Sequence, residues 1–164
     1  MLSREVITMV EVIKPALAAH PFLRGMPPGY VETLGAAASE VTFEPGQRVF
    51  EAGGYAGRFW LIQSGQIALD VRVPDQGAVI VETIGIGDLL GWSWLFPPFT
   101  WTFGAVALGP VRAYEFDAAA VRAACATHPA LSSELTRRVA AVMARRLTAA
   151  RTRLLAASGR PRWT

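Results

Sequence analysis

The sequence predicts a single α+β domain that is mainly β, in which a roll of about eight antiparallel strands is flanked by N-terminal helices and a long C-terminal helix. Two observations carry this prediction. Across residues 41–116, short β-rich runs are separated by turn dipeptides, such as PG and SG, mostly at intervals of roughly eight to twelve residues. After Pro129, apolar residues recur instead at three- and four-residue steps, which is typical of an amphipathic helix.

The composition agrees with one folded domain spanning residues 1–164. Apolar residues make up 52% of the chain and charged residues 18%, which excludes a disordered protein. We divide the chain into N-terminal helices (1–40), the β-roll (41–116), C-terminal helices (117–157) and a tail (158–164).

Two helices are expected in the N-terminal part. Ser3 is well placed to cap the first, because apolar residues follow it at helical spacing: Val6, Met9, Val10, Ile13 and Leu17. The prolines of MPPGYVETLGAAAS favour the start of a second, short helix, with Tyr30, Leu34 and Ala37 on one side.

Alternation of apolar and polar residues identifies strands within the roll. In QIALDVRV the residues on one face are Ile67, Leu69, Val71 and Val73, and AVIVETIG continues the pattern. Strands with half-buried faces and frequent turns indicate an antiparallel sandwich, roll or barrel.

Two helices are expected after the roll. Asp117 is placed to cap the first, and Pro129 occupies the first position of a longer helix that runs to about Ala157. The long helix carries one broad apolar stripe: Leu131, Leu135, Val139, Val142, Met143, Leu147 and Leu154. At 3.6 residues per turn Arg146 falls inside this stripe, so its guanidinium needs either a partner or contact with water.

Residues 89–111 contain no charged side chain, and this run is long enough to cross a membrane. Pro97 and Pro98 stand at its centre, however, and each proline removes a helix hydrogen bond. We therefore expect no membrane span but two short structured pieces joined by a Pro-Pro turn. The charged N-terminus shows no export signal, so a cytoplasmic location is expected.

The residue pattern does not favour catalysis. His20 and His128 both precede a proline at a segment boundary, where a helix-entry role explains them, and neither has a nucleophile or a metal cluster at useful spacing. The glycines of EAGGYAG fit a turn between strands. We expect no enzyme, no catalytic residue, no metal site and no resident cofactor.

Basic residues gather near the C-terminus, because no acidic residue follows Glu134. The arginines there are Arg137, Arg138, Arg145, Arg146, Arg151, Arg153, Arg160 and Arg162. Such a cluster attracts phosphates, nucleic acid or acidic proteins, or forms a solvated helix face, and both interpretations stay open. Only SGRPRWT follows the long helix, which is too short for a winged helix-turn-helix, so sequence-specific DNA binding is not expected.

The stretch HPFLRGMPPGYVETLGAAASEVTFEPGQRVFEAGGYAGRFWLIQSGQIAL resembles the opening of the cyclic-nucleotide-binding domain of the catabolite-activator type. The turn residues at this family's spacing are Pro45, Gly46, Gly53, Ser64, Gly65, Gly87, Asp88 and Gly91. MARRL, at 143–147, is similar to the family's dimer-forming helix. The resemblance covers residues 20–155 and implies an eight-stranded jelly roll that holds a cyclic nucleotide in a phosphate-binding cassette under the long C-terminal helix.

The resemblance places this cassette at residues 87–107, called the cassette segment below. The family's ribose-binding glutamate should follow Gly91, where Trp92 stands, and its phosphate-binding arginine should stand near Trp101 or Thr102. An underpaired phosphate in an apolar pocket costs on the order of several kcal/mol, so ordinary cyclic AMP or cyclic GMP coordination is not expected. Arg146, on the closing helix, matches a position that reaches toward the nucleotide.

The candidate ligand-binding residues are Gly91, Trp92, Ser93, Trp94, Trp101, Thr102 and Arg146. The aromatic residues among them suit core packing, the wall of a site for a flat and weakly polar ligand, or a patch that faces a protein partner. These three interpretations stay open.

Two functions are compatible with these residues. The first is a non-catalytic regulatory module that shifts its closing helix when a cyclic nucleotide or another small molecule enters the roll. The alternative is a ligand-free scaffold for protein interaction and dimerisation. A homodimer through the C-terminal helix is expected in both cases, and a further protein partner is compatible with either.

Overall fold

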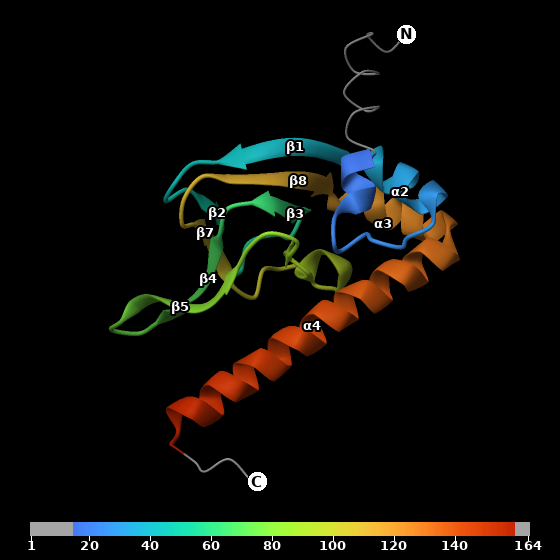
Figure 1. The fold of residues 1–164 in the computed structure, drawn as a ribbon. Helices are drawn as coiled ribbons and strands as arrows, with labels where there is room; N and C mark the ends of the chain where they lie inside the picture. The colour runs from blue at the N-terminus through green and yellow to red at the C-terminus, as the bar shows by residue number, and fades with distance from the viewer. Residues whose placement is uncertain (1–14, 160–164) are drawn as a thin grey trace.

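The computed structural model describes residues 15–159, and Figure 1 shows a β-roll with one long C-terminal helix running beneath it. The strands are β1 (Ala38–Phe43), β2 (Arg48–Phe50), β3 (Arg58–Ser64), β4 (Ile67–Val73), β5 (Gly77–Ile84), β6 (Leu89–Leu90), β7 (Gly104–Ala107) and β8 (Val111–Asp117). The helices are α2 (Pro28–Gly35), the 3-10 helix η1 (Ser93–Leu95), α3 (Ala118–Thr127) and α4 (Pro129–Ala157). Residues 15–19 are also helical, whereas the predicted cap Ser3 lies outside the described residues, as do Val6, Met9, Val10 and Ile13.

The eight strands form two four-stranded sheets, with strand orders β1-β8-β3-β6 and β2-β7-β4-β5. Every strand pair is antiparallel. Side chains between the sheets supply most of the core, which α2, α3 and the first half of α4 extend at one end. The predicted mainly β, α+β fold with a long C-terminal helix is confirmed.

The β4–β5 hairpin departs from the predicted alternation. Ile67 and Leu69 are buried as expected, but Ala68 and Asp70 on the other face are buried as well. Val71 and Val73, in contrast, are partly exposed. The reason is that β7 pairs with β4 only from Ile67 to Asp70, whereas β5 pairs with it as far as Val73. Beyond Asp70 the hairpin therefore extends past the rest of its sheet, as Figure 1 shows.

The SG turn between β3 and β4 requires its glycine. Gly65 has φ +88°, and a Cβ placed on it would lie 2.3 Å from the carbonyl oxygen of Pro110. A side chain at this position would be strained by the backbone and would also clash with the start of β8. The turn connects β3 of one sheet to β4 of the other, and the close approach of its backbone to the start of β8 leaves no room for a side chain.

The helices after the roll begin where the sequence predicts. The Asp117 carboxylate accepts a hydrogen bond from the backbone N–H of Ala120 at 2.9 Å, which caps α3. Pro129 opens α4, where the missing N–H of proline costs no hydrogen bond. The prolines before Tyr30 likewise open α2, in which Val31 and Leu34 are buried.

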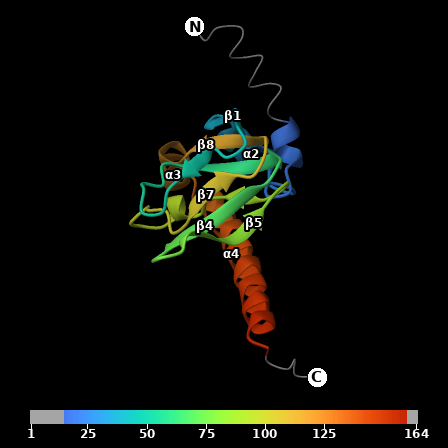
Figure 2. The same ribbon diagram turned by 90° about the vertical axis from the view of Figure 1, so that its left-hand side faces the viewer.

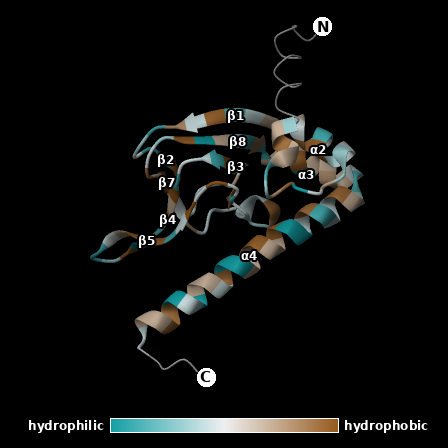
Figure 3. Cartoon of the chain, viewed as in Figure 1, coloured by the Kyte–Doolittle hydropathy of each residue, from teal (hydrophilic) through white to brown (hydrophobic). Residues whose placement is uncertain are grey.

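The apolar stripe of α4 is divided into two halves. Its first members are buried in the domain's own core: Leu131, Leu135, Val139 and Val142. Farther along, Leu147 is 56% exposed and Leu154 is 70% exposed. Figure 2 shows this second half projecting beyond the sheets, and Figure 3 shows apolar and polar residues alternating along it. The stripe is thus one continuous sequence feature with two different environments.

The two histidines differ in their roles. His128 is the residue before α4, which agrees with the helix-entry prediction, although its side chain makes no capping hydrogen bond. His20 is instead buried: its Nε2 lies 2.9 Å from the carbonyl oxygen of Ile62, and its Nδ1 accepts from the N–H of Phe22. His20 therefore fastens the N-terminal part to β3, which corrects the helix-entry prediction for this residue.

Neither a membrane-crossing helix nor a metal-binding cluster is found in the described part of the chain. Within residues 15–159, no helix combines the length and hydropathy needed to cross a membrane. The uncharged run 89–111 forms β6, η1 and β7. No group of three or more His, Cys, Asp or Glu side chains in the same residues is placed to hold a metal ion.

Candidate functional site

The cassette segment starts with a turn that only glycine fits. Gly91 follows β6 with φ +87°, and a Cβ there would lie 2.7 Å from Cζ3 of Trp101. Glycine therefore lets the indole ring of Trp101 pack directly against the backbone. The sequence places both residues in the cassette segment as candidate ligand-binding residues, but it does not reveal that they contact each other.

Trp101 fills the space inside the cassette segment. Its ring stacks on Phe50 with the centroids 4.0 Å apart, lies 6.0 Å from the ring of Trp60, and is 7% exposed. A cavity of only about 20 Å³ remains beside it, lined in part by Gly91, Ser93 and Thr102. That volume is roughly the room that one water needs. Trp92 and Arg146 line it as well, so six of the seven candidate residues are brought together around a space that is nearly filled.

Trp94 has a packing role. Its fully buried ring stacks on Phe59 at 4.2 Å, and Phe59 stacks in turn on Phe116 at 4.7 Å. It is not among the residues that line either cavity beside the cassette segment. Its Nε1 is buried without a hydrogen-bond partner among the described residues. The structure therefore separates Trp94 from the other candidate residues.

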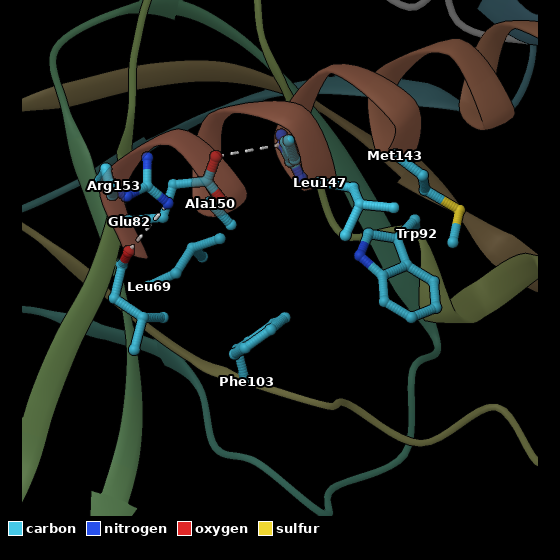
Figure 4. Close-up of a pocket in the computed structure, with 10 residues that line it drawn as sticks. Leu69, Glu82, Trp92, Phe103, Met143, Leu147, Ala150 and Arg153 are labelled. Atoms are coloured by element: carbon cyan, nitrogen blue, oxygen red, sulfur yellow. Dashed lines mark hydrogen bonds and ion pairs between the residues drawn. The ribbon is translucent and has the colours of Figure 1, made fainter. Parts of the chain in front are cut away.

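A larger cavity, about 370 Å³, lies between the roll and the second half of α4, and we call it the α4 cavity. Its lining residues are Leu69, Val81, Glu82, Trp92, Phe103, Met143, Arg146, Leu147, Ala150 and Arg153. Figure 4 shows Trp92 and Met143 at one end, Glu82 and Arg153 at the other, and Phe103 on the side opposite the helix. Cavities of roughly 300 to 1,000 Å³ are typical of small-molecule sites.

Arg146 connects α4 to the roll at the edge of this cavity. Its Nη2 donates a hydrogen bond to the carbonyl oxygen of Leu89, and its Nε lies 3.8 Å from Oε1 of Glu82. Burial lowers the pKa of the Arg146 guanidinium, and the charges of Glu82 and Asp88 oppose that shift. Arginine nevertheless stays protonated at neutral pH. The partner that the sequence required for this arginine is therefore the roll itself.

A second arginine holds the tip of the cassette segment. Nη1 of Arg122, on α3, donates to the carbonyl oxygen of Trp94 at 2.7 Å, and Nη2 donates to the hydroxyl of Tyr55 at 3.1 Å. Its guanidinium also lies 4.3 Å from the ring centroid of Phe99. The cassette segment is thus fixed to the helix that precedes α4.

Sequence reasoning found Trp92 and Arg146 but did not single out Glu82, Arg122 or Arg153. One signal for the missed residues was present, because Arg153 follows Arg146 by seven residues and so lies on the same face of the helix. No local pattern points to Glu82, since its place in the cavity depends on how α4 crosses β5.

An eight-stranded roll with a cavity beneath a closing helix defines a class of ligand-binding regulatory domains. The sequence profile of the cyclic nucleotide-binding domain family matches residues 40–128, more than half of this chain. The chain therefore belongs to the cyclic nucleotide-binding domain family.

A curated relative agrees with this assignment. The CRP-like cAMP-activated global transcriptional regulator of Mycobacterium tuberculosis is 31% identical over 131 residues, which are 80% of this chain and 57% of the regulator. The chain thus spans little more than half the length of the curated relatives it matches.

Solved structures share the fold. A putative cyclic nucleotide-binding protein from Geobacter metallireducens aligns with TM-score 0.75 and 24% identity, covering 82% of this chain and 97% of that one. A cyclic nucleotide-binding domain from Methylobacillus flagellatus aligns with TM-score 0.75 and 15% identity, covering 96% and 88%. The catabolite activator protein of Thermus thermophilus gives 0.66 and 22%, covering 84% and 63%. At these identities the likeness establishes the fold.

Proposed function

We propose that this domain is a non-catalytic regulatory module that binds a small molecule in the α4 cavity and reports its presence through α4. The observation that carries the proposal is the cavity of about 370 Å³, which is walled on one side by the roll and on the other by the exposed half of α4. A ligand in this position contacts both parts at once. Its binding energy can therefore favour one position of the helix over another.

The proposal does not include the phosphate coordination that the family resemblance implies. Trp92 stands where a ribose-binding glutamate would be expected, Trp101 or Thr102 stands where a phosphate-binding arginine would be expected, and Trp101 leaves only about 20 Å³ free. Arg146 lines this space too, but its guanidinium is already engaged by Leu89 and Glu82, so a phosphate placed here would lose its hydration without full compensation, at a cost of several kcal/mol. The wider cavity next to it is the better supported site.

Ala150 allows the proposed site to be closed without disturbing the core. It lines the α4 cavity and is exposed, so Ala150→Leu adds volume at the cavity wall on a helix that accepts leucine readily. Ala144→Leu is the matched control, because Ala144 is also exposed on α4 and is not among the residues that line the cavity. Both variants should keep the wild-type melting temperature to within a few degrees.

The test combines isothermal titration with melting curves of the full chain, using cyclic AMP, cyclic GMP, cyclic dinucleotides and a library of small aromatic and aliphatic compounds. We expect at least one compound to raise the melting temperature of the wild type and of Ala144→Leu, but not of Ala150→Leu. The absence of any heat and any melting shift at millimolar ligand would refute the proposal.

The second candidate function is a dimerisation scaffold, favoured by the exposed leucines of α4. Leu147, Leu154 and Leu155 are all more than half exposed, and leucines on one helix surface are usual at helix–helix contacts. We propose a homodimer through this half of the helix whether or not a ligand binds.

The assembly state tests the scaffold function. The pair Leu154→Glu and Leu155→Glu should convert a dimer into a monomer in light scattering at tens of micromolar, whereas Thr152→Glu should leave it dimeric. Substitution of Leu135 or Val139 is not informative, because both are fully buried in the core. A wild-type monomer at these concentrations would contradict the scaffold function and leave the ligand proposal intact.

A further inference from the structure

The charged groups of the α4 cavity do not cancel, and two of them, Glu82 and Arg153, lie at one end of it. Glu82 and Arg146 face each other at 3.8 Å, and their side chains are 18% and 15% exposed, so each compensates the other. Arg153 lies at the same end in a more exposed position. Its Nη2 donates only to the carbonyl oxygen of Val81 at 3.3 Å, and within residues 15–159 no carboxylate lies within ion-pair distance of it. One cation therefore remains without an anion.

The opposite end of the cavity and the wall that faces the helix are aromatic and apolar. Figure 4 shows the rings of Trp92 and Phe103 bordering the cavity, with Met143 beside Trp92. Trp92 is only half-buried, and the one ring contact it makes within residues 15–159 is an edge contact with Phe96 at 6.3 Å. It therefore has ring surface to offer to a ligand, unlike Trp94 and Trp101, whose faces are stacked on other rings.

The spacing along α4 connects the two ends. Met143, Leu147, Ala150 and Arg153 follow one another at three- and four-residue steps and so share one face of the helix. The small side chain of Ala150 leaves room between the leucine and the arginine. From one end of the cavity to the other, the helix thus changes from apolar to cationic within about 15 Å.

We infer that the α4 cavity takes an aromatic monocarboxylate, whose ring packs against Trp92 and Phe103 and whose carboxylate pairs with Arg153. The inference rests on the proposed function and names the class of its ligand. Guanidinium and carboxylate form a charge-assisted, bidentate pair. Arg146, Arg153 and Glu82 together carry one net positive charge, which a single carboxylate neutralises, so dianions and cations are both disfavoured.

The test compares two probes that share one ring and nearly one shape but differ in charge. Indole-3-acetate carries a carboxylate, and indole-3-acetamide has the same ring with a neutral amide. We expect the full chain to bind the acid about tenfold more tightly than the amide in isothermal titration, a preference worth roughly 1.4 kcal/mol. The preference should weaken as salt is raised, because Arg153 is exposed.

Arg153→Gln should reduce the ratio of acid to amide affinity to near one while leaving the amide affinity unchanged. Arg151→Gln, on another face of the same helix, should keep the wild-type ratio. Ala150→Leu should weaken both probes together. This pattern separates a charge contact at Arg153 from a general effect of positive charge on α4.

Several outcomes would overturn the inference. They are equal binding of acid and amide by the wild type, a preference that survives Arg153→Gln, and binding of cyclic nucleotides with neither indole probe. In each of these cases a ligand that Ala150→Leu excludes would still support the proposed function. Failure of every compound, with no effect of Ala150→Leu, would refute the function as well.

Discussion

The cassette segment and the α4 cavity are neighbours with opposite packing. Around Trp101 the rings of Phe50 and Trp60 leave a space of about 20 Å³, whereas on the other side of Trp92 about 370 Å³ stays open. Both regions contain aromatic residues. An aromatic ring that has stacking partners on its faces acts as core, and one that lacks them is left to form the wall of a site. Composition alone does not distinguish these cases.

The largest effect is expected from removing the Trp101 side chain, which fills the space inside the cassette segment. Trp101→Ala should lower the free energy of unfolding by about 3 to 5 kcal/mol, because it removes a buried ring and leaves a cavity. Trp92→Ala, at the open cavity, should cost about 1 kcal/mol, since the ring is only half-buried. Urea unfolding of both variants measures the difference. Equal losses would end the distinction between the two regions.

A somewhat smaller effect is expected at the glycine beneath Trp101. Gly91→Ala combines an unfavourable positive φ with a clash against the indole ring, and we expect a loss of about 2 to 4 kcal/mol. Gly77→Ala is the matched control, because Gly77 has φ +73° but open space around its Cα, so only about 1 to 2 kcal/mol is expected. If the two variants unfold alike, the contact of Trp101 with the backbone is not tight.

The third test concerns the link between the two regions. Arg146→Met should cost about 1.5 to 3 kcal/mol, because it removes charge-assisted contacts with Leu89 and Glu82. Arg145→Met, at the exposed neighbouring position, should change the unfolding free energy by less than about 0.5 kcal/mol. Chemical denaturation checks both values. A neutral Arg146→Met would mean that apolar contacts alone hold α4 against the roll.

The smallest effect is a dependence on pH at the start of the cassette segment. The carbonyl of Ile62 accepts from both the buried His20 and the N–H of Gly87. Burial holds the pKa of folded His20 below the value of about 6.5 for an exposed histidine, despite the Ile62 hydrogen bond and Asp88. The unfolded chain therefore takes up a proton at higher pH than the folded one. The His20 contribution is complete above pH 6.5 and falls as the pH drops through that value toward the folded-state pKa.

Unfolding measured between pH 5 and pH 8 tests this prediction. His20→Gln should flatten the slope below pH 6.5, because glutamine can still donate to Ile62 but does not titrate in this range. His128→Gln should keep the wild-type slope. An unchanged slope in His20→Gln would assign the pH dependence to other groups.

The fold could be predicted because its signals are local. Turn glycines, the alternation in β4 and the cap at Asp117 each act over a few residues, and all agree with one architecture. Parts of the site could not be predicted in the same way. Trp94 and Trp101 are both tryptophans in one uncharged run, and their packing depends on Phe59 and Phe50, which come from distant strands.

The charged end of the α4 cavity shows the same limit. Arg146 could be singled out because a charge inside an apolar stripe is a visible irregularity. Glu82 and Arg153 follow the ordinary patterns of a strand and a helix. Only the crossing of α4 over β5 brings them to one place.

The division of α4 into a buried half and an exposed half gives the helix the mechanics of a lever. Its fulcrum is the contact of Arg146 with Leu89, and the eleven residues beyond it, which the exposed Arg153–Val81 hydrogen bond also holds to the roll, extend about 16 Å to Ala157. A tilt of roughly 10° at the fulcrum displaces that end by about 3 Å. A ligand that displaces α4 by a fraction of an ångström near Leu147 would thus displace Leu154 and Leu155 by a larger distance.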